Sequence, residues 1–190
     1  MDEKKFVSKI YVARLSDDKT PRENLTHVFF KDGNAYASDG HILARVPVDS
    51  ITLNISEEEL KRLDGKCIHR DVFKQLLKYK QIEIREDCIV ATLGHHTITY
   101  SLIDESEMAS PGFEKVIEEE NTKERTPVTG IGINTEFLND LAIAMGCASA
   151  VKLDFTSYKS KIYVTDTSQL NDALGVIMPT VIEPVLEGFE

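Results

Sequence analysis

The side chains that most often carry out catalysis or bind metals are present, but they form no pattern that supports such chemistry. His95 and His96 follow Gly94 in a predicted turn and have no third ligand at a metal-binding spacing. The carboxylates fall in predicted linkers and in the first turns of helices. The sequence has no glycine-rich phosphate loop, nucleophile elbow or cysteine–histidine pairing. We therefore expect a non-catalytic protein with no cofactor and no metal.

The composition is that of an ordinary globular protein, with 42% hydrophobic and 28% charged residues in 190. Cys67, Cys88 and Cys147 are far apart, odd in number and without CxxC spacing, which predicts reduced thiols in a cytoplasmic protein. The charged start and the lack of a long apolar run predict no signal peptide and no membrane contact. The net charge of −10 argues against a surface that coats DNA by charge alone, but it allows a small basic face.

Residues 37–44 (ASDGHILA) are the stretch around which we interpret the rest of the chain. Apolar runs at 27–30, 34–37 and 42–46 are separated by two Asp-Gly pairs. Asp-Gly between such runs predicts hairpins, because glycine adopts a positive φ without steric cost. The sequence therefore predicts a three-stranded meander. A sharper interpretation makes Gly40 and His41 the rim of a docking groove.

A unit of one strand, one helix and three strands is predicted twice after this meander, and residues 2–50 match it without its first strand. Because one unit cannot cover its own apolar face, each must pack against a neighbour. The prediction is an α+β fold with helices on one face of antiparallel sheets. The predicted helices are 2–14, 56–63, 71–80 and 134–146; the later strands are 66–69, 81–85, 88–93, 97–102, 130–133, 151–155, 161–165 and 173–178.

These units predict a domain over residues 1–117, built from half-units 1–50 and 66–103. Residues 118–129 contain a run of charged side chains and are predicted to be a solvated linker. A third half-unit is predicted at 130–182, followed by a tail at 183–190.

Four motifs, in the right order, resemble the bacterial DNA polymerase III beta subunit, the sliding clamp. Residues 37–44 resemble its A-T-D-G-H-R-L-A, and residues 21–25 (PRENL) resemble its R-P-x-L segment. Residues 103–117 resemble its L-I-D-G-x-(F/Y)-P-x-(Y/F)-x-x-V-I-P segment, with an insertion. Residues 176–179 (VIMP) are similar to the V-M-P that closes its last domain. The chain looks like the family's middle domain, minus its first strand, joined to the last half of the third.

The resemblance implies a DNA-clamp-like fold of repeated β-α-β-β-β half-units and a function as a polymerase processivity factor. In the family, a groove where the middle and last domains meet receives short linear motifs of polymerases and other replication or repair partners. An apolar cleft with a polar rim of His41 and Lys115 would accept a peptide carrying leucine and phenylalanine anchors. Ile42 and Val181 stand where the family has arginines, so the rim has lost positive charge. The matching positions are Leu25, Ser38, Gly40, His41, Ile42, Leu43, Pro111, Lys115, Val116, Val176, Ile177, Met178, Pro179, Thr180 and Val181.

The resemblance also implies contact with double-stranded DNA, without sequence readout, through helices that line a ring. Predicted helices 2–14 and 71–80 supply basic side chains for this lining, whereas helix 134–146 offers Glu136 and Asp140 instead. The candidate DNA-facing residues are Lys4, Lys5, Lys9, Arg14, Arg70, Lys74, Lys78 and Lys80.

Two hypotheses therefore remain open. In the first, copies of the chain form a homo-oligomeric ring that tethers a polymerase to DNA, with a dimer or monomer as other possible states. In the second, the chain is a clamp-derived adaptor or decoy that binds clamp-interacting peptides, or the clamp loader, without encircling DNA. Leu186 and Phe189 in the tail could dock in the chain's own cleft or in a neighbour's, or the tail could be frayed.

Overall fold

The computed structural model describes residues 5–6, 11–16, 22–118, 130–147, 149–157, 160–168 and 172–180. The strands are β1 (His27–Lys31), β2 (Asn34–Ser38), β3 (Ile42–Pro47), β4 (Lys66–His69), β5 (Gln81–Ile84), β6 (Cys88–Leu93), β7 (His96–Ser101), β8 (Ile103–Asp104), β9 (Val151–Asp154), β10 (Ile162–Asp166) and β11 (Leu174–Ile177). The helices are α1 (Val48–Ile51), α2 (Glu57–Leu63), α3 (Arg70–Leu76), α4 (Phe113–Glu118) and α5 (Thr135–Met145), with 3-10 turns η1 (Val12–Arg14), η2 (Glu23–Thr26) and η3 (Glu105–Glu107).

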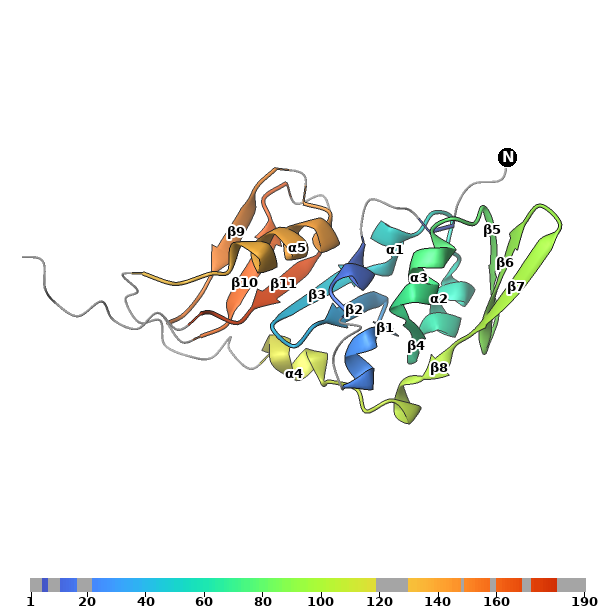
Figure 1. The fold of residues 1–190 in the computed structure, drawn as a ribbon, viewed down its shortest axis with the longest axis horizontal. Helices are drawn as coiled ribbons and strands as arrows, with labels where there is room; N and C mark the ends of the chain where they lie inside the picture. The colour runs from blue at the N-terminus through green and yellow to red at the C-terminus, as the bar shows by residue number, and fades with distance from the viewer. Residues whose placement is uncertain are drawn as a thin grey trace, which may run out of the picture.

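The strands form an eight-stranded sheet with the order β8-β4-β1-β2-β3-β11-β10-β9, and a three-stranded sheet with the order β5-β6-β7 (Figure 1). Every strand pair described in these sheets is antiparallel. The large sheet joins two meanders, β1-β2-β3 and β9-β10-β11, through pairing of β3 with β11. The predicted α+β class with antiparallel sheets is confirmed.

The two faces of the large sheet are covered differently. On the face that we call the helix face, η1, α3 and α5 pack over the main core, which includes Phe73, Leu141 and Met145. On the opposite face, which we call the α4 face, Phe113 of α4 packs in a smaller cluster with Tyr36 (Figure 1). This division follows from the pleat of the strands, since successive side chains point to opposite faces.

Local sequence signals explain where several elements begin and end. Ser56 and Glu59 form a reciprocal capping box at the start of α2. The Asn134 side chain accepts a hydrogen bond from a backbone amide in the first turn of α5, and Gly146 ends this helix with a φ of 72°. Asp32 and its following glycine both have positive φ in the turn between β1 and β2.

The predicted helix at residues 2–14 is wrong in the part that the structure describes. Phe6 forms an isolated antiparallel bridge with Thr52, and the described residues 11–16 contain the 3-10 turn η1 in place of the end of an α-helix. The apolar spacing of this segment fits a helix, but Phe6 instead packs edge-on against Phe73 in the main core. Residues 2–4 and 7–10 lie outside the described residues.

Two other expected elements are shorter than predicted. Helix α3 ends at Leu76 rather than near residue 80, and the expected strand at 130–133 is reduced to a bridge between Gly132 and Thr180. The predicted linker at 118–129 begins inside helix α4, which ends at Glu118. Residues 119–129 and the predicted tail at 183–190 lie outside the described residues. The division into domains stays a prediction. Across the described ranges, no helix combines the length and the apolar character needed to cross a membrane.

Candidate functional site

The turn at Gly40 and the end of β11 lie next to each other. Ile42 pairs with Ile177 across the β3–β11 ladder, and the Met178 amide donates to the His41 carbonyl at 3.0 Å. The two segments that the sequence suggested as the walls of a cleft therefore share one surface.

Side-chain hydrogen bonds hold the turn between β2 and β3 in shape. The Asp39 carboxylate accepts from the backbone amides of His41 and Ile42, each at 2.8 Å. The Ser38 hydroxyl donates to the Ile42 carbonyl at 2.7 Å and accepts from the Gly40 amide at 3.0 Å. Gly40 has a φ of 93°, which a residue with a Cβ adopts only with strain. The rim at His41 is thus preorganised by its own sequence.

Leu25 lies against this turn, and its neighbour Asn24 connects it to the loop before α4. A Cβ placed on Gly40 would lie 3.6 Å from Leu25 Cδ1. The Asn24 side-chain amide donates to the Ala109 carbonyl, which ties η2 to the loop that leads to the half-buried Pro111. Leu25, Gly40 and Pro111 are thereby brought into one neighbourhood.

Helix α4 is anchored by aromatic packing on the α4 face. The Phe113 ring stacks on Tyr36 with 5.5 Å between centroids and an interplanar angle of 9°. It also meets Phe29 edge-on at 5.4 Å. Aromatic pairs in these geometries add about 0.5–1.5 kcal/mol beyond the burial of their area.

The joint between the two meanders forms the floor beneath the second turn of α4. Leu43 of β3 and Val176 of β11 are buried in the α4-face cluster, and the half-buried Val116 packs against it. The Tyr163 hydroxyl donates to the Ile117 carbonyl at 2.8 Å, so β10 also holds the helix. Strands from both meanders therefore support α4.

The predicted groove residues divide between the two faces. Ile42 and Ile177 point to the helix face and are buried in the main core, so the expectation that they line the groove is corrected. They alternate along their strands with Leu43 and Val176, and one β3–β11 register sets both pairs. Among the other predicted groove residues, the buried ones are Leu25, Ser38, Leu43 and Val176, and the half-buried ones are Pro111, Val116 and Pro179. The exposed ones are Gly40, His41, Lys115, Met178 and Thr180. Val181 lies outside the described residues.

Phe137 is a neighbour of the rim that the sequence interpretation did not include. Its ring, on α5, stacks on His41 with 5.4 Å between centroids and an interplanar angle of 15°. The sequence placed Phe137 in the apolar stripe of a helix, but nothing in that periodicity showed which side chain would reach His41.

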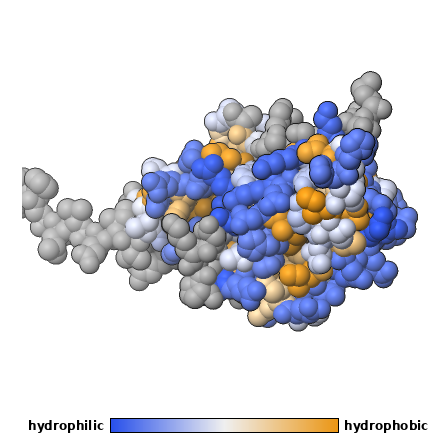
Figure 2. Space-filling model, turned by 45° about the vertical axis from the view of Figure 1, so that its right-hand side comes forward, coloured by the Kyte–Doolittle hydropathy of each residue, from blue (hydrophilic) through white to orange (hydrophobic). Residues whose placement is uncertain are grey.

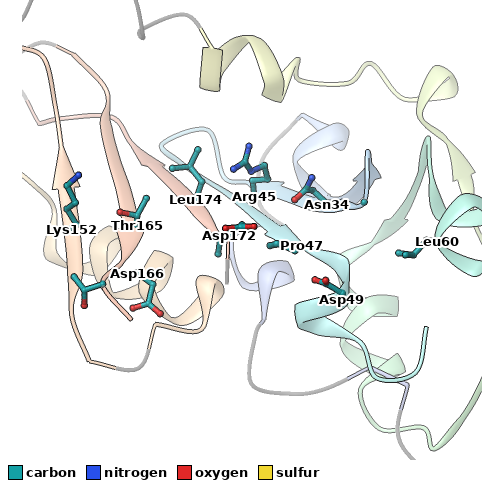
Figure 3. A pocket seen from close by; sticks show the side chains of 13 residues that line it. Asn34, Arg45, Pro47, Asp49, Leu60, Lys152, Thr165, Asp166, Asp172 and Leu174 are labelled. Atoms are coloured by element: carbon teal, nitrogen blue, oxygen red, sulfur yellow. The ribbon is translucent and has the colours of Figure 1, made fainter. Parts of the chain in front are cut away.

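Two described cavities lie elsewhere. One is an open depression of about 1160 Å³ near the start of β11, and Figure 3 shows Arg45 from β3 and Lys152 from β9 with Thr165 between them. A smaller depression of about 490 Å³ lies beside α2 and includes Arg62 and Lys66. Neither of these two cavities contains a predicted groove residue. Among the described residues, the candidate site consists of exposed and half-buried side chains at the β3–β11 joint.

Several of the predicted DNA-facing cations are engaged within the chain. The Arg14 guanidinium lies 2.7 Å from the Asp140 carboxylate, and Lys5 forms an ion pair with Glu59. Burial opposes ionisation of Glu59, but the Lys5 ammonium and hydrogen bonds from Ser56 hold its pKa below the usual value. Arg70 donates a hydrogen bond to the Ser16 carbonyl, and Lys74 Nζ lies 3.7 Å from Asp71 Oδ1. Lys78 and Lys80 are exposed. Lys4 and Lys9 lie outside the described residues.

No family model matches the chain, and neither does any curated protein sequence. Solved structures do match. The Helicobacter pylori beta clamp in complex with diflunisal has a TM-score of 0.64 at 12% identity, covering 96% of this chain and 68% of that one. The DNA polymerase III subunit beta of Borrelia burgdorferi, in complex with a natural product, has a TM-score of 0.63 at 13% identity, with coverages of 91% and 61%.

The DNA polymerase sliding clamp of Pseudomonas aeruginosa, solved with a ligand, has a TM-score of 0.59 at 16% identity, with coverages of 88% and 61%. The chain thus spans only 61% of the length of that clamp. The resemblance suggested by the sequence motifs is confirmed at the level of the fold. The chain has the fold of the bacterial DNA polymerase III beta sliding clamps, over part of their length.

Proposed function

We propose that the protein is a non-catalytic, sliding-clamp-like accessory factor. Its β3–β11 joint binds the linear peptide motifs of a DNA polymerase and of other replication or repair partners. The observation that carries this proposal is the hydrogen bond from the Met178 amide to the His41 carbonyl. It joins the two segments whose sequences resemble the peptide groove of the clamp family, in a chain that has the clamp fold.

The chemistry of the joint fits an extended peptide with apolar anchors. Met178 is 47% exposed beside the buried Val176, so a leucine or phenylalanine side chain could cover it without displacing the core. The exposed His41 and Lys115 add polar groups at the rim. Apolar anchors in such a cleft supply most of the affinity for a linear motif.

Fluorescence anisotropy with a labelled clamp-motif peptide tests this site. We expect Met178→Ala to weaken binding by about tenfold, which corresponds to about 1.4 kcal/mol. Leu53→Ala is the matched control, because Leu53 is a large apolar residue of similar exposure (45%) away from the joint, and it should leave binding unchanged. The proposal fails if the wild-type protein does not bind the peptide, or if Met178→Ala and His41→Ala both bind like wild type.

A second candidate function is an adaptor or decoy that binds the same peptides, or the clamp loader, without encircling DNA. The Arg14–Asp140 and Lys5–Glu59 ion pairs favour it, because they neutralise cations that a DNA-lining surface would need. The net charge of −10 also favours the adaptor, because it opposes binding to DNA. Retention of the protein on circular DNA, and its release when that DNA is cut, would support the ring. Failure to be retained on circles would support the adaptor.

A further inference from the structure

Arg45 of β3 is half-buried, and part of its guanidinium has nothing to bond to. Its Nε is buried and, among the described residues, has no hydrogen-bond partner. By contrast, the Arg62 guanidinium donates to the Ile84 carbonyl at 2.8 Å, and Arg85 donates to Glu83 at 2.9 Å. Figure 2 shows hydrophilic side chains, in blue, over much of one face of the molecule, where solvent can hydrate them. A buried donor without a partner carries a free-energy penalty, which a ligand that accepts from it would remove.

Arg45 belongs to a row of side chains that runs straight across the large sheet. The register pairs Arg45 with Leu174 of β11, and Leu174 with Thr165 of β10. Thr165 in turn pairs with Lys152 of β9. On its other side Arg45 pairs with Tyr36, which belongs to the α4-face cluster, so the row lies on the α4 face. Figure 3 shows this row lining the depression of about 1160 Å³.

The carboxylates that line the depression are separated from this row. Asp166 follows Thr165 in β10, so the pleat turns it to the opposite face, and its carboxylate accepts from the Ser168 amide at 3.2 Å. Asp49 lies in α1 and Asp172 precedes β11, so both lie beyond the ends of the strands that bear the row. The α4-face part of the depression therefore presents donors, with the carboxylates at its margin.

We propose that this row is an anion-binding site, in which the Arg45 guanidinium binds an oxyanion group, phosphate or carboxylate, of a small ligand. The planar N–H groups of a guanidinium match two oxygens of either group. A ligand that extends from Arg45 across the sheet would meet the Thr165 hydroxyl and then the Lys152 ammonium. Lys152 lies 3.7 Å from Asp154, but its side chain is 67% exposed, so this weak pair leaves it free to turn toward a ligand. The depression has room for a small molecule.

The anion site is separate from the proposed peptide site. Along β11, Val176 lies between Leu174 and the exposed Met178, and Val116 of α4 packs against the cluster that contains Val176. Helix α4 therefore covers the sheet between the row and Met178. The inference goes beyond the proposed function, and either can fail without the other.

NMR signals of the arginine Nε–H groups in the isotope-labelled full chain test the site directly. Inorganic phosphate and acetate are the two probes, added at an ionic strength held constant with chloride so that screening does not change. We expect the Arg45 signal to shift saturably with at least one probe, and the probe that binds distinguishes a phosphate ligand from a carboxylate ligand. The Arg85 signal is the internal control, because its guanidinium is already paired with Glu83. An Arg45 signal that neither probe moves, or that moves only in parallel with Arg85, would overturn the proposal.

A conservative variant shows whether the shape of the guanidinium matters. Arg45→Lys keeps the charge but loses the planar fork, so we expect its affinity for the bound probe to fall about tenfold. Arg85→Lys is the matched control and should bind like the wild type. Equal affinity of Arg45→Lys and the wild type would contradict the assignment.

Thermal unfolding provides a readout that needs no ligand. Arg45→Met removes the unsatisfied donor and keeps an unbranched apolar stem, so we expect a Tm equal to or above that of the wild type in ligand-free buffer. Arg62→Met is the matched control and should lower the Tm, because it removes the donor to the Ile84 carbonyl. If Arg45→Met lowered the Tm as much as Arg62→Met, Arg45 would have a partner within the chain and the proposal would fail.

Two further measurements complete the test. The bound probe should raise the Tm of the wild type and leave that of Arg45→Met unchanged. The affinity of Arg45→Lys for the clamp-motif peptide should equal that of the wild type, so failure of this inference and failure of the peptide site can be told apart.

Discussion

Adding one methyl group to Gly175 should loosen the joint between the two meanders. Gly175 lies in β11, paired with Ala44 of β3 and Val164 of β10. A Cβ at this position would lie 2.4 Å from Leu141 Cδ2 and 2.7 Å from Met145 Sδ, both on α5. The φ of Gly175 is not positive, so the obstacle to alanine is contact with α5 and not backbone strain.

The size of the effect follows from two opposing contributions. Overpacking a close-packed core costs about 1–3 kcal/mol, and the Leu141 and Met145 side chains are fully buried, so they cannot swing into solvent. Replacing a strand glycine by alanine stabilises by about 0.5–1 kcal/mol through the unfolded state. We expect Gly175→Ala to lower the free energy of unfolding by about 1–2 kcal/mol.

A double-mutant cycle separates the contact from other causes. Leu141→Ala alone should cost about 2–5 kcal/mol because it leaves a cavity. Combined with Gly175→Ala, the loss should be smaller than the sum by about 1 kcal/mol, since the added methyl group then has room. Urea unfolding of the four proteins measures these differences.

Gly130→Ala is the matched control, because a Cβ there meets nothing within 4 Å and its φ is not positive. It should be neutral or slightly stabilising. The reasoning fails if Gly175→Ala is as stable as Gly130→Ala, or if the effects of Gly175→Ala and Leu141→Ala simply add.

Two further predictions concern helices α2 and α4. Glu59→Gln should lower the free energy of unfolding by about 1 kcal/mol, because it weakens the capping box and the ion pair with Lys5. The pKa of Glu59 is lower in the folded state than its ordinary value of 4.5, so the ionised side chain stabilises the fold above pH 4.5 and this stabilisation is lost as the pH falls below that value. If the difference in free energy of unfolding between variant and wild type stayed constant down to pH 3, this reasoning would be contradicted. Phe113→Ala should cost about 3–5 kcal/mol in urea unfolding, because the buried ring packs against Tyr36, and it should also weaken peptide binding; a loss below 1 kcal/mol would show that α4 is not anchored there.

Most of the local structure could be predicted from the sequence. The strand expected at residues 88–93 is β6 with the same bounds, because a short apolar run between turn residues is typical of a strand. The helix from 134 to 146 is α5 within one residue at each end, because Asn134 caps it and Gly146 ends it. In the described part of residues 2–14, the predicted helix is wrong because Phe6 lies in the core and bridges to the distant Thr52. Local spacing carries no information about that contact.

The candidate site, too, could be predicted only in part from the sequence. The motifs around Gly40 and Met178 indicated that the two segments belong together, and the structure places them on adjacent strands. They did not indicate that Ile42 and Ile177 face the main core or that Phe137 stacks on His41.

By itself, the sequence determined the α+β class, the antiparallel meanders and the turn at Asp39-Gly40, because these depend on residues close together in the chain. The tertiary structure alone decided the partner and register of β11, and with them which side chains are floor, rim or core. The physical reason is that a register shift of one residue between β3 and β11 would exchange the two faces of a strand. That choice is made by packing between segments far apart in the chain.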